Sequence, residues 1–90
     1  PSLTIEDETT HNFKIFPNPA NTSVTIDLQS NFKNVERISV LNIQGQLIKT
    51  NTNISKQIIT FKTETYKSGV YFIEIKLNNQ SKIVKKLIVN

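Results

Sequence analysis

The residues that could carry out chemistry in this chain of 90 residues are few and lie far apart in the sequence. His11 is the single histidine, and there is no cysteine. A nucleophilic triad and a histidine- or thiolate-based metal site are therefore excluded. The carboxylates Asp27, Glu36 and Glu74 have no paired spacing, which argues against a two-carboxylate hydrolase. We expect no enzyme, no catalytic or metal-ligating residue and no cofactor, and a function that depends on recognition.

The charged residues limit the kinds of partner that the chain can have. Eleven basic and 7 acidic residues give a formal net charge of +4 at pH 7. Most lysines are spread along expected strands, as on solvated faces, and the exception is the group Lys82, Lys85 and Lys86. Arg37 is the only arginine and no aromatic residues alternate with basic ones, so we expect no nucleic-acid binding. No apolar run is long enough for insertion into a membrane.

The pattern of apolar residues predicts an all-β domain. From Phe13 onward, β-branched and aromatic residues dominate, and turn signals recur about every 8–12 residues, a spacing typical of a sandwich. The fold class that we predict is a seven-stranded antiparallel immunoglobulin-like β-sandwich. Its strands are expected at Phe13–Phe16, Thr22–Leu28, Glu36–Asn42, Gln46–Thr50, Gln57–Phe61, Val70–Leu77 and Ser81–Val89.

Alternation within the strands indicates which side chains face the core. In Val70–Leu77, apolar and polar residues alternate, so that every second residue from Tyr71 shares one buried face. In Ser81–Val89 the alternation is broken by Lys85. Two explanations remain open: a bulge near Lys85-Lys86 turns both lysines outward, or this strand is covered on both faces.

Turn-forming residues mark the connections between strands. Asn78-Asn79 predicts a two-residue type I′ hairpin in which both residues have positive φ. Gly45 is expected to close the Asn42–Gly45 turn in the left-handed conformation. Gly69 either takes a similar conformation or lets the following strand approach a loop closely. Pro17-Asn18-Pro19 lacks two backbone donors, so it ends the first strand and protects its edge.

The aromatic residues are assigned mainly to the core. Those expected inside are Phe13, Phe61 and Tyr71. The Tyr71 hydroxyl is expected to bond a neighbouring loop, as in the tyrosine corner of immunoglobulin-like sandwiches, and Tyr66 to close the end of the sandwich. Phe72 and Phe32 are expected to face outward, one residue fewer than a convincing sugar-binding strip. A carbohydrate- or calcium-binding module of a secreted enzyme and an adhesin-like structural domain remain alternatives.

The first residues of the chain differ in composition from the rest. Residues 1–11 are polar and acidic and lack periodicity, which indicates a linker before a domain that spans residues 12–90. The chain begins at Pro1 and has no signal peptide. We interpret it as a fragment of a longer protein.

The order of these segments resembles a known family of secretion tags. The quoted segments are Ile15-Phe16-Pro17-Asn18-Pro19, Val24-Thr25-Ile26, Ile38–Asn42 with Gly45–Ile48, Ser68–Ile73, and the terminal strand with its lysines. In this order they resemble the type A C-terminal sorting domain of the type IX (Por) secretion system, over residues 13–90. Asn42 stands where the family often has an acidic residue, and Tyr66 where leucine is usual, which leaves the local hydrogen bonding open.

The resemblance implies a sorting signal. Such domains end large secreted proteins of Bacteroidetes-type bacteria and direct the cargo in front of them from the periplasm through the outer-membrane translocation machinery to the cell surface or the medium. A sortase-like peptidase commonly cuts in the preceding linker. The residues that we expect the machinery to recognise are Lys82, Lys85, Lys86, Leu87, Ile88, Val89 and Asn90. The motif positions are Pro17, Asn18, Pro19, Gly45, Gly69 and Tyr71. The cleavage linker would comprise Glu6, Asp7, Glu8, Thr9, Thr10 and His11.

Overall fold

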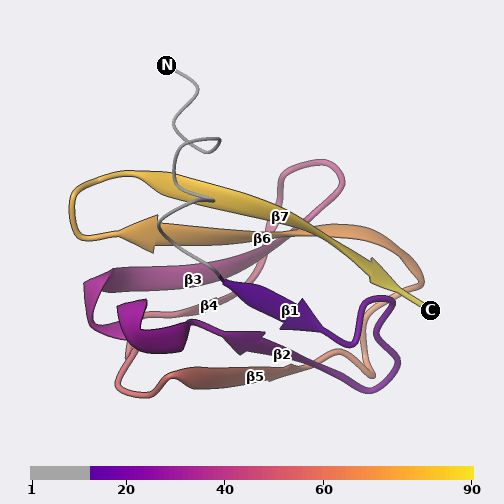
Figure 1. Cartoon of the computed structure of the whole chain (residues 1–90). Helices are drawn as coiled ribbons and strands as arrows, with labels where there is room; N and C mark the ends of the chain where they lie inside the picture. Colours follow the sequence, from indigo (N-terminus) through magenta and orange to yellow (C-terminus); the bar gives the residue numbers. More distant parts are fainter. Residues whose placement is uncertain (1–12) are drawn as a thin grey trace.

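Seven strands form two antiparallel sheets that pack face to face. The computed structural model describes residues 13–90. The three-stranded sheet has the order β1-β2-β5, with β1 at Lys14–Phe16, β2 at Ser23–Asp27 and β5 at Ile58–Lys62. The four-stranded sheet has the order β4-β3-β6-β7, with β4 at Leu47–Asn51, β3 at Val35–Asn42, β6 at Gly69–Leu77 and β7 at Lys82–Val89 (Figure 1). This arrangement confirms the predicted immunoglobulin-like sandwich, and every strand end lies within one residue of its predicted place.

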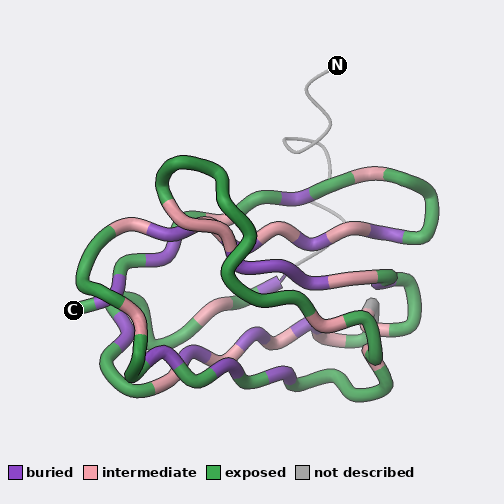
Figure 2. Tube along the Cα trace, turned by 180° about the vertical axis from the view of Figure 1, so that it is seen from behind, coloured by how far each residue is buried: buried purple, intermediate pink, exposed green. Residues whose placement is uncertain are grey.

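The core lies between the two sheets and consists mainly of alternate residues of β2, β5, β6 and β7, with Ile38 and Val40 from β3. Along β6, Tyr71, Ile73, Ile75 and Leu77 are buried, while the residues between them are half-buried on the other face. Figure 2 shows the alternation of buried and exposed residues, and it shows β4 as an almost continuously exposed stretch. The sandwich is therefore open beside β4, where the three-stranded sheet does not extend far enough to cover it.

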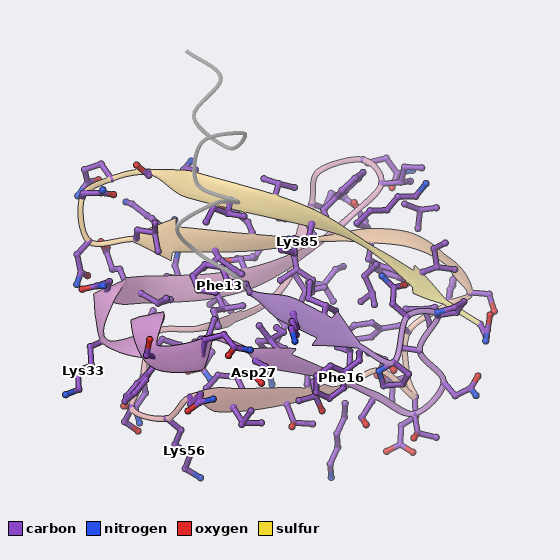
Figure 3. The ribbon with its side chains drawn as sticks, viewed as in Figure 1. Phe13, Phe16, Asp27, Lys33, Lys56 and Lys85 are labelled. Atoms are coloured by element: carbon purple, nitrogen blue, oxygen red, sulfur yellow. The ribbon has the colours of Figure 1, made fainter. Side chains whose placement is uncertain are left out.

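The structure supports neither of the two explanations that the sequence leaves open for Lys85. The β6–β7 register continues without a shift from Gly69↔Val89 to Lys76↔Lys82, so β7 has no bulge. Val84 is exposed, so β7 is not covered on both faces either. Lys85 faces the core side but is only half-buried (Figure 3). Its aliphatic stem can cover apolar surface at the sheet edge while the ammonium group reaches water.

The hairpin between β6 and β7 has a loop of three residues, so the predicted two-residue type I′ turn is wrong. The backbone N–H of Gln80 donates to Leu77 O at 3.0 Å, and the N–H of Leu77 donates to Ser81 O at 2.9 Å. Positive φ occurs at Gln80 (+76°) and at neither Asn78 nor Asn79. The two asparagines therefore form a β-turn, and the third loop residue takes the left-handed position, as is common in three-residue loops.

The β3–β4 turn has the expected geometry, and its hydrogen bonds come from Asn42. Gly45 has a φ of +85°, and its N–H donates to Asn42 O at 2.9 Å. The Oδ1 atom of Asn42 accepts bonds from the N–H groups of Gln44 (3.0 Å) and Gln46 (2.9 Å). A neutral amide at this position thus satisfies the donors of the turn.

A short 3₁₀ helix, η1 (Gln29–Asn34), joins the two sheets between β2 and β3. Phe32 on this helix packs against the core, contrary to the expectation that it faces outward. The preceding Leu28 is fully buried, and its N–H donates to Gln57 O at 2.8 Å. Within residues 13–90, no helix has the length and apolar character needed to cross a membrane.

Candidate recognition site

The terminal strand β7 is an edge strand of the four-stranded sheet, with β6 on one side. The side chains of the predicted recognition residues divide between its two faces. Leu87 and Val89 are buried in the core, where no partner can contact them while the domain is folded. Lys82, Lys86 and Ile88 are exposed on the opposite face.

Asn18 holds the outer edge of β7 through its side-chain amide. Its Nδ2 group donates to Lys86 O at 2.9 Å, and its Oδ1 atom accepts the N–H of Ile88 at 2.9 Å. These are the two backbone groups that a neighbouring strand residue would bond in a parallel ladder. Pro17 and Pro19 have no N–H, so the amide of the residue between them supplies the missing donor.

Ala20 continues the same pairing with its backbone. Its N–H donates to Ile88 O at 2.7 Å, and its carbonyl accepts the N–H of Asn90 at 2.9 Å. Ala20 and Val89 form a parallel bridge, and Ala20 is fully buried. The corner at Pro17–Pro19 therefore moves the chain from the three-stranded sheet, where β1 pairs with β2, to the edge of the four-stranded sheet.

The covered edge of β7 reaches from Lys86 to Asn90. The backbone groups of Lys82 and Val84 point to the same edge, because alternate residues of β7 bond β6. Within residues 13–90, no further hydrogen bond reaches this edge at Lys82 and Val84. An extended segment of a partner could pair there, in the way that β-strand addition works.

Gly69 and Tyr71 lie on β6 directly opposite the end of β7. Their partners are Val89 and Leu87, respectively. Gly69 has a φ of +149°, and a Cβ atom there would meet nothing within 4 Å, so backbone conformation and not close approach accounts for this glycine. The Tyr71 hydroxyl donates to Lys67 O at 2.7 Å, which is the expected loop contact.

Tyr66 packs on Tyr71 with ring centroids 5.3 Å apart and against the core, at the end of the sandwich. Its hydroxyl oxygen is buried and has no hydrogen-bond partner among the residues that the structure describes. Burial, and then the nearby Tyr71, raise the pKa of Tyr66 above its ordinary value of 10.0. Both rings line a shallow hollow of about 850 Å³ between β4 and β5, together with Ile48, Phe61 and three lysines.

The structure thus brings three of the sequence motifs together at one end of the sandwich. The Pro17–Pro19 corner and the segment Gly69–Tyr71 both lie against the last residues of β7. The Gly45 turn shares a hollow with Gly69 and Tyr71 through Asn42 and Gln44. The linker residues Glu6 to His11 lie outside the described residues. Among the described residues, no group of three His, Asp or Glu side chains is placed to hold a metal ion.

The comparison with known protein families matches this chain to one family. Residues 14–90 match the family described as the secretion system C-terminal sorting domain. The chain belongs to this family. Among curated proteins, none matches the chain. The sorting domain is a type IX secretion signal, and its family is not a family of enzymes.

Two features of the sorting domain were missed in the sequence. The amide of Asn18 bonds residues 68 and 70 positions away, and no local pattern indicates such a contact. Val84 and Phe72 share their parity with Lys82, Lys86 and Ile88, so the alternation in the sequence indicates that all five lie on one outer face. The alternation of β6 and β7 could have found this second feature.

Asn18→Ala should loosen the end of β7. We expect the free energy of unfolding to fall by about 1–2 kcal/mol, since two hydrogen bonds are lost and two exposed backbone groups return to water. Amide hydrogen exchange at Ile88 should become faster. Asn21→Ala is the control, because Asn21 is exposed and bonds Thr63 through its backbone carbonyl. Unchanged exchange at Ile88 in Asn18→Ala would show that the amide does not hold this edge.

Tyr71→Phe and Tyr66→Phe should have opposite effects on stability. Tyr71→Phe removes the bond to Lys67 O and should cost about 0.5–1.5 kcal/mol, whereas Tyr66→Phe removes a buried hydroxyl without a partner and should be neutral or stabilising.

The raised pKa of Tyr66 also predicts a pH effect. The unfolded chain ionises first as the pH rises above 10.0, so stability falls from there up to the folded pKa.

Tyr66→Phe should therefore lose less stability in alkali than the unchanged domain. Chemical denaturation at neutral pH and at alkaline pH measures both effects. Two results would contradict these predictions. One is an equal loss of unfolding free energy in Tyr71→Phe and Tyr66→Phe at neutral pH. The other is the same decrease of unfolding free energy with rising alkaline pH in Tyr66→Phe and in the unchanged domain.

Proposed function

We propose that this domain directs a larger cargo protein, attached to its N-terminal side, across the outer membrane through the type IX secretion system. In this proposal the domain crosses the periplasm folded, and the outer-membrane translocation machinery recognises it. A sortase-like peptidase then removes it at the cell surface by cutting within Glu6 to His11. The family match over residues 14–90 is the observation that carries the proposal.

The geometry of β7 supports recognition of the terminal strand. The exposed residues Lys82, Lys86, Ile88 and Asn90 are available to a partner in the folded domain. The backbone of Lys82 and Val84 adds an edge that is unpaired within residues 13–90 and that a partner strand could extend. Leu87 and Val89 are buried in the core and hold these groups in place from the inner face, where Lys85 is half-buried.

Attachment to a reporter tests the function. A reporter protein with a periplasmic signal, followed by residues 1–90, is produced in a bacterium with a type IX system. We expect the reporter in the medium or on the surface, and we expect mass spectrometry to place its new C-terminus between Glu6 and Asn12. The reporter without the domain, and the fusion in a strain lacking the system, should stay in the periplasm. Equal export of the reporter without the domain would refute the proposal.

Val84→Pro tests whether a partner strand pairs with the edge of β7. Proline removes the outward N–H of Val84, which β6 does not use, and edge strands tolerate it. We expect export of the fusion to fall at least about tenfold, which corresponds to about 1.4 kcal/mol of lost binding. Val84→Ala keeps the N–H and is the control. If both variants are exported equally, strand addition at Val84 is wrong, whether or not the domain is a sorting signal.

A further inference from the structure

The outer faces of the two sheets differ in character. On the three-stranded sheet, the central strand β2 turns Ser23, Thr25 and Asp27 outward, as a solvated antiparallel face normally does. Two exposed apolar residues also lie on this face, Phe16 and Ile58, but they are on the two edge strands with polar β2 between them. On the four-stranded sheet, large apolar side chains occupy much of the outer face. We define the outer-face patch as Leu41, Leu47, Val70, Phe72, Val84 and Ile88.

Strand register makes the outer-face patch continuous across the sheet. Leu41 on β3 lies opposite Leu47 on β4 and opposite Phe72 on β6. One step along the same face, Val70 lies opposite Ile88 on β7. Because directly opposed residues on a sheet have their Cβ atoms about 5 Å apart, these side chains adjoin one another.

The patch is more exposed than strand formation requires. Leu47 is 60% exposed, Val84 49% and Ile88 38%. High strand propensity alone would explain valine and isoleucine here, but β2 forms its strand with threonine and serine outward. An apolar face of this extent, bordered by polar residues, marks an interaction surface.

The charges around the patch are mostly positive. Glu74 is the carboxylate between Phe72 and Lys76, and it is already paired with Arg37 at 4.0 Å and Lys82 at 3.9 Å. Lys86 lies directly opposite Phe72, between Val84 and Ile88 on the same face. Within residues 13–90, no carboxylate forms an ion pair with Lys86. A complementary surface would therefore place a carboxylate against Lys86.

Two other occupants fit less well. Residues 13–90 contain all 11 basic residues but four of the seven acidic ones, so their formal net charge is +7, and two copies would repel each other. A lipid layer would have to accept the Glu74 carboxylate beside Phe72, and an ionised carboxylate is costly in hydrocarbon.

We propose that the outer-face patch, with Phe72 at its centre and Lys86 beside it, is the surface by which this domain docks onto a folded protein of the secretion machinery, one that presents an apolar face bordered by carboxylates. This inference rests on the proposed function. It extends the proposed recognition surface from the terminal strand to the whole outer face of the four-stranded sheet, since β7 contributes Val84, Lys86 and Ile88 to that face.

Paired substitutions in the exported reporter fusion test the docking surface. Phe72→Thr removes the central ring and keeps a strand-forming residue, and Lys86→Glu reverses an exposed charge that forms no ion pair within residues 13–90. We expect each to lower the exported fraction at least about tenfold. The controls are Ile58→Thr on the outer face of the other sheet and Lys56→Glu in the loop before β5 (Figure 3), and both should be exported like the unchanged fusion.

The outcomes separate this inference from the proposed function. If the unchanged fusion stays inside, the sorting function fails. If it is exported and Phe72→Thr and Lys86→Glu are exported equally well, the docking surface is wrong and the sorting function stands. Cooperative unfolding of the purified Phe72→Thr domain is required to show that this variant is folded. If Phe72→Thr does not unfold cooperatively, Lys86→Glu provides the test by itself.

Cross-linking and two binding measurements test the kind of partner. Phe72→p-benzoylphenylalanine in the fusion should cross-link under light to a protein of the type IX outer-membrane apparatus, and Phe16→p-benzoylphenylalanine on the other sheet should not. The purified domain should not sediment with phosphatidylglycerol vesicles at about 0.15 M salt and should be monomeric in sedimentation velocity. Vesicle binding or dimerisation that Phe72→Thr abolishes would assign the patch to lipid or to a second copy, and would overturn the proposed partner.

Discussion

The pairing of Asn18 with the end of β7 is the interaction on which the order of the terminal strand depends. A terminal edge strand has one free side, and a free edge with its chain end tends to fray or to pair with other chains. Here an amide side chain and the backbone of Ala20 occupy that side from Lys86 to Asn90. The start and the end of the domain therefore order each other, although nearly the whole chain lies between them.

This mutual ordering explains why the sequence motifs gather at one end of the sandwich. The proline corner must change sheets to reach β7, and β6 must begin at Gly69 so that Tyr71 lies opposite Leu87. The hydroxyl of Tyr71 then fixes the loop at Lys67. Each motif is weak as a local signal, but together they form the support for one exposed strand. Such support holds the backbone and side chains of the strand in one geometry, as a recognition surface requires.

The sequence predicts the parts of the fold that depend on local patterns. Alternation in β2 and β6 gives the strands and the buried face, because each depends on residues two positions apart. Prediction from local patterns fails where a distant contact or the shape of the sandwich determines the conformation of a residue. Nothing local shows that Gln80 and not Asn79 takes positive φ, or that Lys85 is half-buried on the core side of β7. The bonds of Asn18 span most of the chain, so only the three-dimensional structure shows them.

The difference between the two outer faces indicates that the two sheets have different roles. The residues that fill the core face inward, so the core gives no reason for Phe72 or Leu41 to be apolar on the outside. Exposed apolar side chains on a small domain carry a risk of aggregation, and the lysines on the same face reduce it, since repulsion between like charges keeps two copies apart. The same lysines attract a surface of the opposite charge. A face that repels its own copies and favours an acidic partner suits a secretion signal that a protein recognises.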